Sequence, residues 1–210
     1  MSRALSRPAD APSLAADAAL AAAALRWMAG LFQAPPGPEG LAALRQLLPT
    51  LAGDAALGPP LARMADRLTA LDDPVRQLGI AFNRLFVGAG GPETVAPYES
   101  AQAEPQGRLF GTAAAEMTAL LARLDLRVAD GLGEPPDHLA VELQLLARLV
   151  AAGDPQEKLL LHRLRGWVPR FRDACAAHDP TGFYAAAAAA LSTLLDRRAA
   201  ALGSALHAID

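Results

Sequence analysis

Hydrophobic residues recur along this chain every three to four positions, which is the spacing of one face of an α-helix. Near the N-terminus Leu20, Trp27, Met28 and Leu31 follow this spacing, and near the C-terminus Phe183, Tyr184, Leu191, Leu194 and Leu195 do so as well. The pattern predicts helices at 11–33, 39–50, 59–71, 74–87, 107–124, 136–152, 155–177 and 180–206. We therefore expect an all-α protein.

Three Asp-Pro pairs mark the beginnings of predicted helices. They are Asp73-Pro74, Asp154-Pro155 and Asp179-Pro180. An aspartate just before a helix accepts hydrogen bonds from free backbone N–H groups, and proline fits the first helical position because its missing N–H is not needed there. Each pair predicts a capped helix start.

Composition agrees with a helical fold. Hydrophobic residues make up 52% of the 210 residues, and much of this share is alanine, whereas valine and isoleucine are few. The chain is long enough to bury a sizeable core as one domain, 1–210. The net charge of −3 gives no reason to expect a nucleic-acid surface. Lys158 is the only lysine.

Two connections between predicted helices are rich in glycine and proline. Residues 88–106 form a long segment of the kind that is often functional. Residues 126–135 end in a diproline, which restricts the backbone at the entry of the next helix. A hinge at Glu134–His138, between lobes 1–133 and 134–210, is therefore an alternative to a single unit.

Several simpler assignments do not fit the sequence. Gly88–Gly91 lacks the Gly-Lys-Ser/Thr of a phosphate loop, and Ser100 lacks the glycines of a nucleophile elbow. Cys175 is the only cysteine, so we expect a small buried residue and no internal disulfide. We expect Arg197-Arg198 on a solvated edge. A core role is expected for the aromatic residues Trp27, Trp167, Phe171 and Phe183.

The N-terminal segment does not have the pattern of an export signal. Arg3 and Arg7 are not adjacent, and Asp17 and Arg26 interrupt the alanine-rich run that follows. No stretch of about 18 uncharged apolar residues is present, so we expect no membrane span. These features favour a cytoplasmic protein.

Two segments carry a distinctive set of motifs. The first is Phe82-Asn83-Arg84-Leu85-Phe86-Val87-Gly88 with Pro97-Tyr98-Glu99-Ser100, and the second is Glu134-Pro135-Pro136-Asp137-His138 with Leu139, Glu142 and Leu143. Together they resemble the signature of the TorD/DmsD/NarJ family. The members of that family are cytoplasmic chaperones that bind the twin-arginine leader and apoprotein of molybdenum oxidoreductases. The resemblance implies a helical bundle-like TorD/DmsD-type fold, with no cofactor, no metal and no catalysed reaction.

The resemblance extends over about residues 74–195. The segment Gly107–Gly111 opens a helix as in family members, and Trp167, Phe171 and Phe183-Tyr184 match landmarks of the last two family helices. One departure is Arg163, where many relatives carry histidine.

The resemblance also implies a leader-binding site on these two segments. Guanidinium groups favour carboxylates because the planar fork matches two oxygens at once. Acidic residues would hold the arginines, while Leu85, Phe86, Tyr98 and Leu139 would line a groove for the apolar part of the leader. His138 would orient the site and change its charge near neutral pH. The expected site residues are Leu85, Phe86, Tyr98, Glu99, Ser100, Glu104, Gly111, Glu134, Pro136, Asp137, His138 and Glu142.

Three alternatives stay open at this point. The first is an assembly factor of the nitrate-reductase type whose client is not exported. The second is a helical metalloenzyme that uses Asp137, His138 and Glu142. The third is a plain helical scaffold. The chain is expected to act as a monomer or as a domain-swapped dimer, since a hinge permits such exchange.

Overall fold

The computed structural model describes residues 17–54, 57–88, 91, 93–103, 111–128 and 134–207, with side chains as far as residue 203. The helices are α1 (Ala18–Gln33), α2 (Pro38–Leu51), α3 (Gly58–Thr69), α4 (Pro74–Phe82), α5 (Glu99–Ala103), α6 (Thr112–Arg123), α7 (Leu139–Ala152), α8 (Gln156–His178) and α9 (Phe183–His207). In these residues the β-structure is confined to one isolated bridge between Tyr98 and His138. The prediction of an all-α fold is confirmed.

Each predicted helix is present within the described ranges, with ends that differ by a few residues. Part of the predicted helix 11–33 and part of 107–124 lie outside the described residues. The predicted helix 74–87 consists of α4 followed by a π-helical turn, Asn83–Val87. The prediction missed α5, which lies inside the expected loop 88–106. A five-residue helix is too short to show a periodic pattern.

All three aspartates accept backbone hydrogen bonds near a helix start, but only Pro74 takes the first helical position, since Pro155 precedes α8 and Pro180 lies before α9 begins. The Asp73 carboxylate accepts a hydrogen bond from the Arg76 N–H at 3.2 Å. The Asp154 carboxylate accepts one from the Gln156 N–H at 2.8 Å. The third aspartate, Asp179, accepts from the backbone of Thr181 at 2.9 Å, just before α9 begins.

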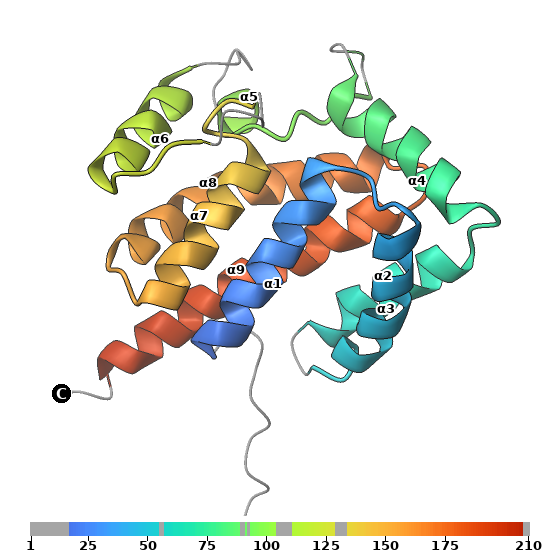
Figure 1. The fold of residues 1–210 in the computed structure, drawn as a ribbon, viewed down its shortest axis with the longest axis horizontal. Coiled ribbons are helices and arrows are strands. Elements are labelled where there is room, and N and C mark those ends of the chain that lie inside the picture. The colour runs from blue at the N-terminus through green and yellow to red at the C-terminus, as the bar shows by residue number, and fades with distance from the viewer. Residues whose placement is uncertain are drawn as a thin grey trace, which may run out of the picture.

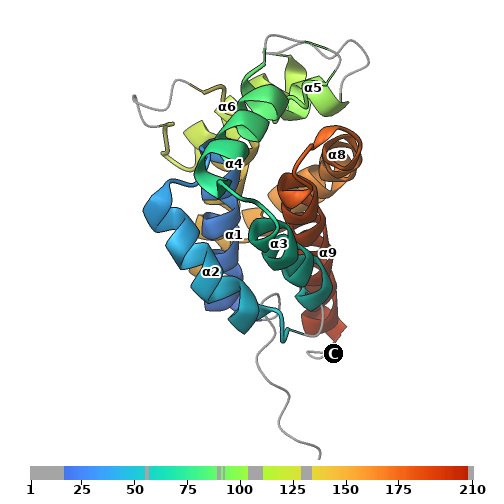
Figure 2. The ribbon, with the colours of Figure 1, turned by 90° about the vertical axis from the view of Figure 1, so that its right-hand side faces the viewer.

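Helix α7 packs against α1 and α8. Its buried positions occupy almost its whole circumference, which is expected of a helix enclosed by others. Helix α1 lies beside both α7 and α9, and α8 packs against both as well (Figure 1). Helices α2 and α3 form a pair, and α3 lies alongside α9 (Figure 2). At the other end of the fold, α5 contacts α6 and α8.

One hydrophobic cluster extends from α1 to α9, so helices on both sides of residues 134–138 share a core. At its centre Phe86 contacts other aromatic rings. Its ring centroid lies 5.1 Å from that of Phe82, 5.3 Å from that of Tyr184 and 5.8 Å from that of Phe171. The predicted core aromatics Trp167, Phe171 and Phe183 are buried. A hinge motion at residues 134–138 stays a prediction.

Two further predictions can be compared with the structure. Cys175 is buried, as expected, and burial raises the pKa of its thiol. The expectation of a solvated Arg197-Arg198 edge is wrong for Arg198, which is only 7% exposed. Its Nε donates to Glu157 Oε1 at 2.6 Å and its second guanidinium nitrogen to Oε2 at 3.2 Å, which joins α9 to α8. Sequence periodicity gave no sign of this buried partner.

Candidate functional site

The two signature segments meet at the N-terminus of α7. The Glu99 N–H donates to the Asp137 carbonyl at 3.0 Å, and the Leu139 N–H donates to the Pro97 carbonyl at 2.8 Å. These bonds flank the bridge between Tyr98 and His138. The Pro-Tyr-Glu-Ser loop is therefore held by its backbone against the Glu-Pro-Pro-Asp-His loop.

Asp137 lies inside this junction and is fully buried. Its Oδ2 accepts a hydrogen bond from the Ser100 N–H at 3.0 Å, at the first turn of α5. A carboxylate at a helix N-terminus satisfies a free N–H group and complements the helix dipole. No described residue is a partner of Asp137 Oδ1 or of the Ser100 hydroxyl, both of which are buried. In this conformation Asp137 stabilises the loop junction from within.

His138 caps α7. Its Nδ1 accepts a hydrogen bond from the Ala140 N–H at 3.1 Å, and its ring packs edge-to-face against Tyr98 with centroids 5.0 Å apart. Burial lowers the pKa of His138, while the nearby carboxylates of Glu134 and Asp137 partly oppose this. Because Nδ1 acts as an acceptor, the imidazole is neutral here. The pKa of His138 thus shifts downward, whereas the sequence led us to expect a change of charge near neutral pH.

Tyr98 reaches from the first signature segment to the second. Its hydroxyl donates to Glu134 Oε2 at 2.7 Å. Burial raises the pKa of the Tyr98 phenol, and the Glu134 carboxylate adds to this effect. Tyr98 and Glu134 are both partly exposed, so this pair stands at the surface end of the junction.

The remaining described carboxylates belong to a deeper polar group beside α8. Trp167 Nε1 donates to Glu142 Oε2 at 3.2 Å, and Glu142 is fully buried. Burial raises the pKa of Glu142 well above its ordinary value, and the charge of Glu99 together with a hydrogen bond to it raises the pKa further. This direction favours the protonated form of Glu142, which can then donate to Glu99. Glu99 in turn accepts from the Arg163 guanidinium at 2.5 Å.

The expected apolar groove residues belong mostly to the core. Leu85 and Leu139 have no exposed surface and Phe86 is 7% exposed, so in this conformation they do not line an open groove. Gly111 precedes α6 as its N-cap residue. Glu104 lies outside the described residues. Among the expected site residues that the structure describes, Glu134 and Pro136 reach a surface hollow.

This hollow has a volume of about 480 Å³ and lies between α6 and residues 125–128, which follow that helix. Leu121, Leu126 and Val128 supply its apolar wall, and Glu134 and Pro136 stand on its edge. A second hollow of about 240 Å³ continues from the same wall along α7. Sequence reasoning did not select these wall residues, although apolar Leu126 and Val128 alternate with charged positions just before the signature.

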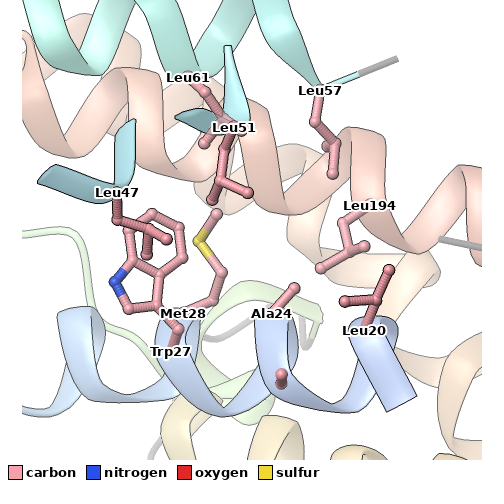
Figure 3. A pocket seen from close by; sticks show the side chains of 10 residues that line it. Leu20, Ala24, Trp27, Met28, Leu47, Leu51, Leu57, Leu61 and Leu194 are labelled. Carbon is pink, nitrogen blue, oxygen red and sulfur yellow. The ribbon is translucent and has the colours of Figure 1, made fainter. Parts of the chain in front are cut away.

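A third hollow lies between α1, α2, α3 and α9. Figure 3 shows Trp27 and Met28 on α1 facing Leu51 and Leu61, with Leu194 of α9 on another side. Trp27, which was predicted to be in the core, is only half-buried here. The volume of this hollow is about 190 Å³, and no titratable side chain lines it. It offers no carboxylate to a cationic ligand.

The residues that the structure describes contain no group of three or more His, Cys, Asp or Glu side chains in a metal-binding arrangement. Asp137, His138 and Glu142 each face a different partner, as described above. The metalloenzyme alternative thus gains no support. Among the described helices none is long and apolar enough to cross a membrane.

Comparisons with known proteins agree with the resemblance of the signature segments. The family model of the nitrate reductase delta subunit matches residues 50–173. The chaperone protein TorD of Aeromonas salmonicida is 32% identical over 190 residues, covering 80% of this chain and 85% of the relative. TorD of Salmonella arizonae is 30% identical over 177 residues, covering 76% and 80%.

A solved structure shares the fold. It is a putative redox enzyme maturation protein from Archaeoglobus fulgidus, with a TM-score of 0.58 and 22% identity, covering 84% of this chain and 93% of that one. The signature residues, the helical fold and the matches to curated relatives point the same way. The chain belongs to the TorD-like family of chaperones, which the nitrate reductase delta subunit model also describes.

Proposed function

We propose that this protein is a cytoplasmic chaperone for the catalytic subunit of a molybdenum oxidoreductase. It binds the twin-arginine leader and the apoprotein, and it releases them for export after the cofactor has been inserted. Family membership and the curated TorD relatives support this function. No reaction is assigned to the protein itself.

The observation that carries the leader-binding part is the position of Glu134. Its partly exposed carboxylate lies at the edge of the hollow, which Asp125 and Arg127 also line, and it accepts a hydrogen bond from the Tyr98 hydroxyl. A leader combines guanidinium groups with a modestly apolar stretch. Glu134 suits a guanidinium, and the wall of Leu121, Leu126 and Val128 suits the apolar side chains.

Asp137 and His138 influence binding through the positions of other groups. Asp137 fixes the first turn of α5, and His138 packs against the ring of Tyr98. Because Tyr98 holds Glu134, a change at His138 moves the acceptor for the leader arginine. Leu85, Phe86 and Leu139 belong to the hydrophobic core.

Calorimetric titration with a twin-arginine leader peptide and its twin-lysine variant tests this proposal. We expect the wild-type protein to prefer the twin-arginine peptide, because lysine lacks the planar fork. Glu134→Gln should weaken that binding about tenfold, which is ~1.4 kcal/mol. Glu39→Gln, which alters an exposed carboxylate on α2, is the matched control and should bind as the wild type does. Equal affinity of the wild type for the two peptides would refute the proposed function.

A second candidate is assembly of a molybdenum enzyme that is not exported. The match to the nitrate reductase delta subunit model supports this second candidate. Co-purification of the tagged protein with its client from the native host separates the two. A client whose N-terminus carries adjacent arginines supports the export function, and a client without them supports the second candidate.

A further inference from the structure

Arg163 of α8 occupies a closely fitted polar site. One guanidinium nitrogen donates to Glu116 Oε2 at 2.5 Å. The other donates to Glu99 Oε2 at 2.5 Å and to the Ala113 carbonyl at 3.2 Å. The acceptors of the site thus belong to α5 and α6, and the guanidinium belongs to α8.

A fully buried carboxyl group completes the inner wall of the site. Glu142 lies next to Glu99 and Arg163, and among the described residues its buried Oε1 has no hydrogen-bond partner. Two carboxylates, those of Glu99 and Glu116, pair with one guanidinium. The arrangement has one more negative than positive charge, so it retains affinity for a cation when Arg163 leaves.

The site opens to solvent on one side. The Glu116 side chain is 59% exposed, whereas the Glu99 and Arg163 side chains are 12% and 13% exposed. A guanidinium from outside can therefore approach through Glu116. Arginine has a long, flexible stem, so the Arg163 side chain can leave the site without a movement of α8.

We propose that Glu99, Glu116 and the Ala113 carbonyl form a guanidinium-binding site, which Arg163 fills in the free protein and an arginine of the client leader fills in the complex. This inference rests on the proposed function, since it deepens the account of how the leader is recognised. It makes Arg163 an internal competitor that lowers affinity for the leader, while the arrangement of the acceptors favours arginine over lysine in the complex.

The site itself is tested without any leader. Arg163→Ala leaves the acceptors in place and removes their cation, so its unfolding temperature should fall. Methylguanidinium at millimolar concentration should restore part of that loss, and methylammonium at the same concentration should restore less. Arg165→Ala is the matched control, because it removes an arginine of the same helix from an exposed pair with Asp196. Equal effects of the two cations on Arg163→Ala would overturn the guanidinium site.

Arg163→Gln tests the same site if the alanine variant does not fold. The amide keeps a donor for one carboxylate but is too short and has too few donors to bond Glu99, Glu116 and the Ala113 carbonyl together. With a twin-arginine peptide, this variant should bind at least several-fold more tightly than the wild type, while its affinity for the twin-lysine peptide should change less. An unchanged or weaker affinity for the twin-arginine peptide would overturn the competition.

These outcomes separate the two proposals. If the wild type shows no preference for the twin-arginine peptide, the proposed function fails. The competition then fails with it, while selective rescue by methylguanidinium still supports the built site. If the wild type shows that preference and the Arg163 variants bind and unfold as the control does, the leader function stands and the Arg163 inference fails.

Discussion

Asp137 and Ser100 lie 37 positions apart in the sequence and are joined by one buried hydrogen bond, from the Ser100 N–H to Asp137 Oδ2 at 3.0 Å. This bond anchors α5 to the loop that precedes α7. The two signature segments are therefore held together in the interior by a bond between a side chain and a backbone N–H group. This contact is separate from any binding at the surface.

Replacing Asp137 should destabilise the protein with little change in helix content. Asp137→Ala leaves the buried Ser100 N–H without an acceptor, which costs about 1–3 kcal/mol. Asp137→Asn keeps one acceptor oxygen and should lose less. Urea unfolding followed by circular dichroism gives both values, and α5 is too short to alter the far-ultraviolet signal much. If the alanine variant is as stable as the wild type, the anchoring role of Asp137 is wrong.

Because of Glu142, the free energy of unfolding of the wild type should decrease at higher pH. Burial raises the pKa of Glu142 in the folded protein above its ordinary value of 4.5, so folding favours the protonated form. The stabilisation by this group is complete below the pKa of the unfolded chain and is lost as pH rises through the folded pKa. The charges that face it are Glu99 and Arg163, and the Trp167 N–H is its hydrogen-bond donor.

Glu142→Gln isolates this effect. Glutamine can still donate to Glu99 and accept from Trp167, but it has no proton to release. Urea midpoints measured from about pH 5 to about pH 9 should therefore fall less in the variant than in the wild type. Parallel pH profiles for the two proteins would show that Glu142 is already ionised in the folded state.

The buried pair of Arg198 and Glu157 should contribute far more to the stability of the fold than the exposed neighbouring residue Arg197 does. The two side chains are 9% and 5% exposed, so Arg198→Ala leaves a buried carboxylate without its cation. A loss of about 3–5 kcal/mol is expected for breaking such a pair. Arg197 is exposed, and Arg197→Ala should stay within about 0.5 kcal/mol of the wild type. Similar denaturation midpoints for the two variants would contradict this difference.

Phe86 should act on the core rather than on the leader directly. Its ring lies among Phe82, Phe171 and Tyr184, so Phe86→Ala should cost about 3–5 kcal/mol. Val87, the next residue, is 64% exposed and Val87→Ala should have little effect. Where Phe86→Ala still folds, its leader affinity per folded molecule should be close to that of the wild type. A large loss of affinity in a fully folded variant would make Phe86 a contact residue.

The sequence alone predicted the helices because their apolar spacing and their caps are local. Asp73, for example, accepts from a backbone N–H three residues along the chain, so its role follows from its neighbours. In the same way the aromatic residues Phe171 and Phe183 fall on apolar helix faces, and both are buried. The family resemblance depended on the order of residues, which the chain displays directly.

The tertiary structure decided which way the signature side chains face. Asp137 and Glu134 stand three residues apart and are both acidic, yet Asp137 is buried against Ser100 and Glu134 lies at a surface hollow. Arg197 and Arg198 are adjacent and identical, and only Arg198 is enclosed, because Glu157 of another helix lies opposite it. Local propensity and periodicity specify helices and their apolar faces. Whether a charged residue is paired, neutralised or exposed depends on partners that are far away in sequence, and only the packed fold brings those partners together.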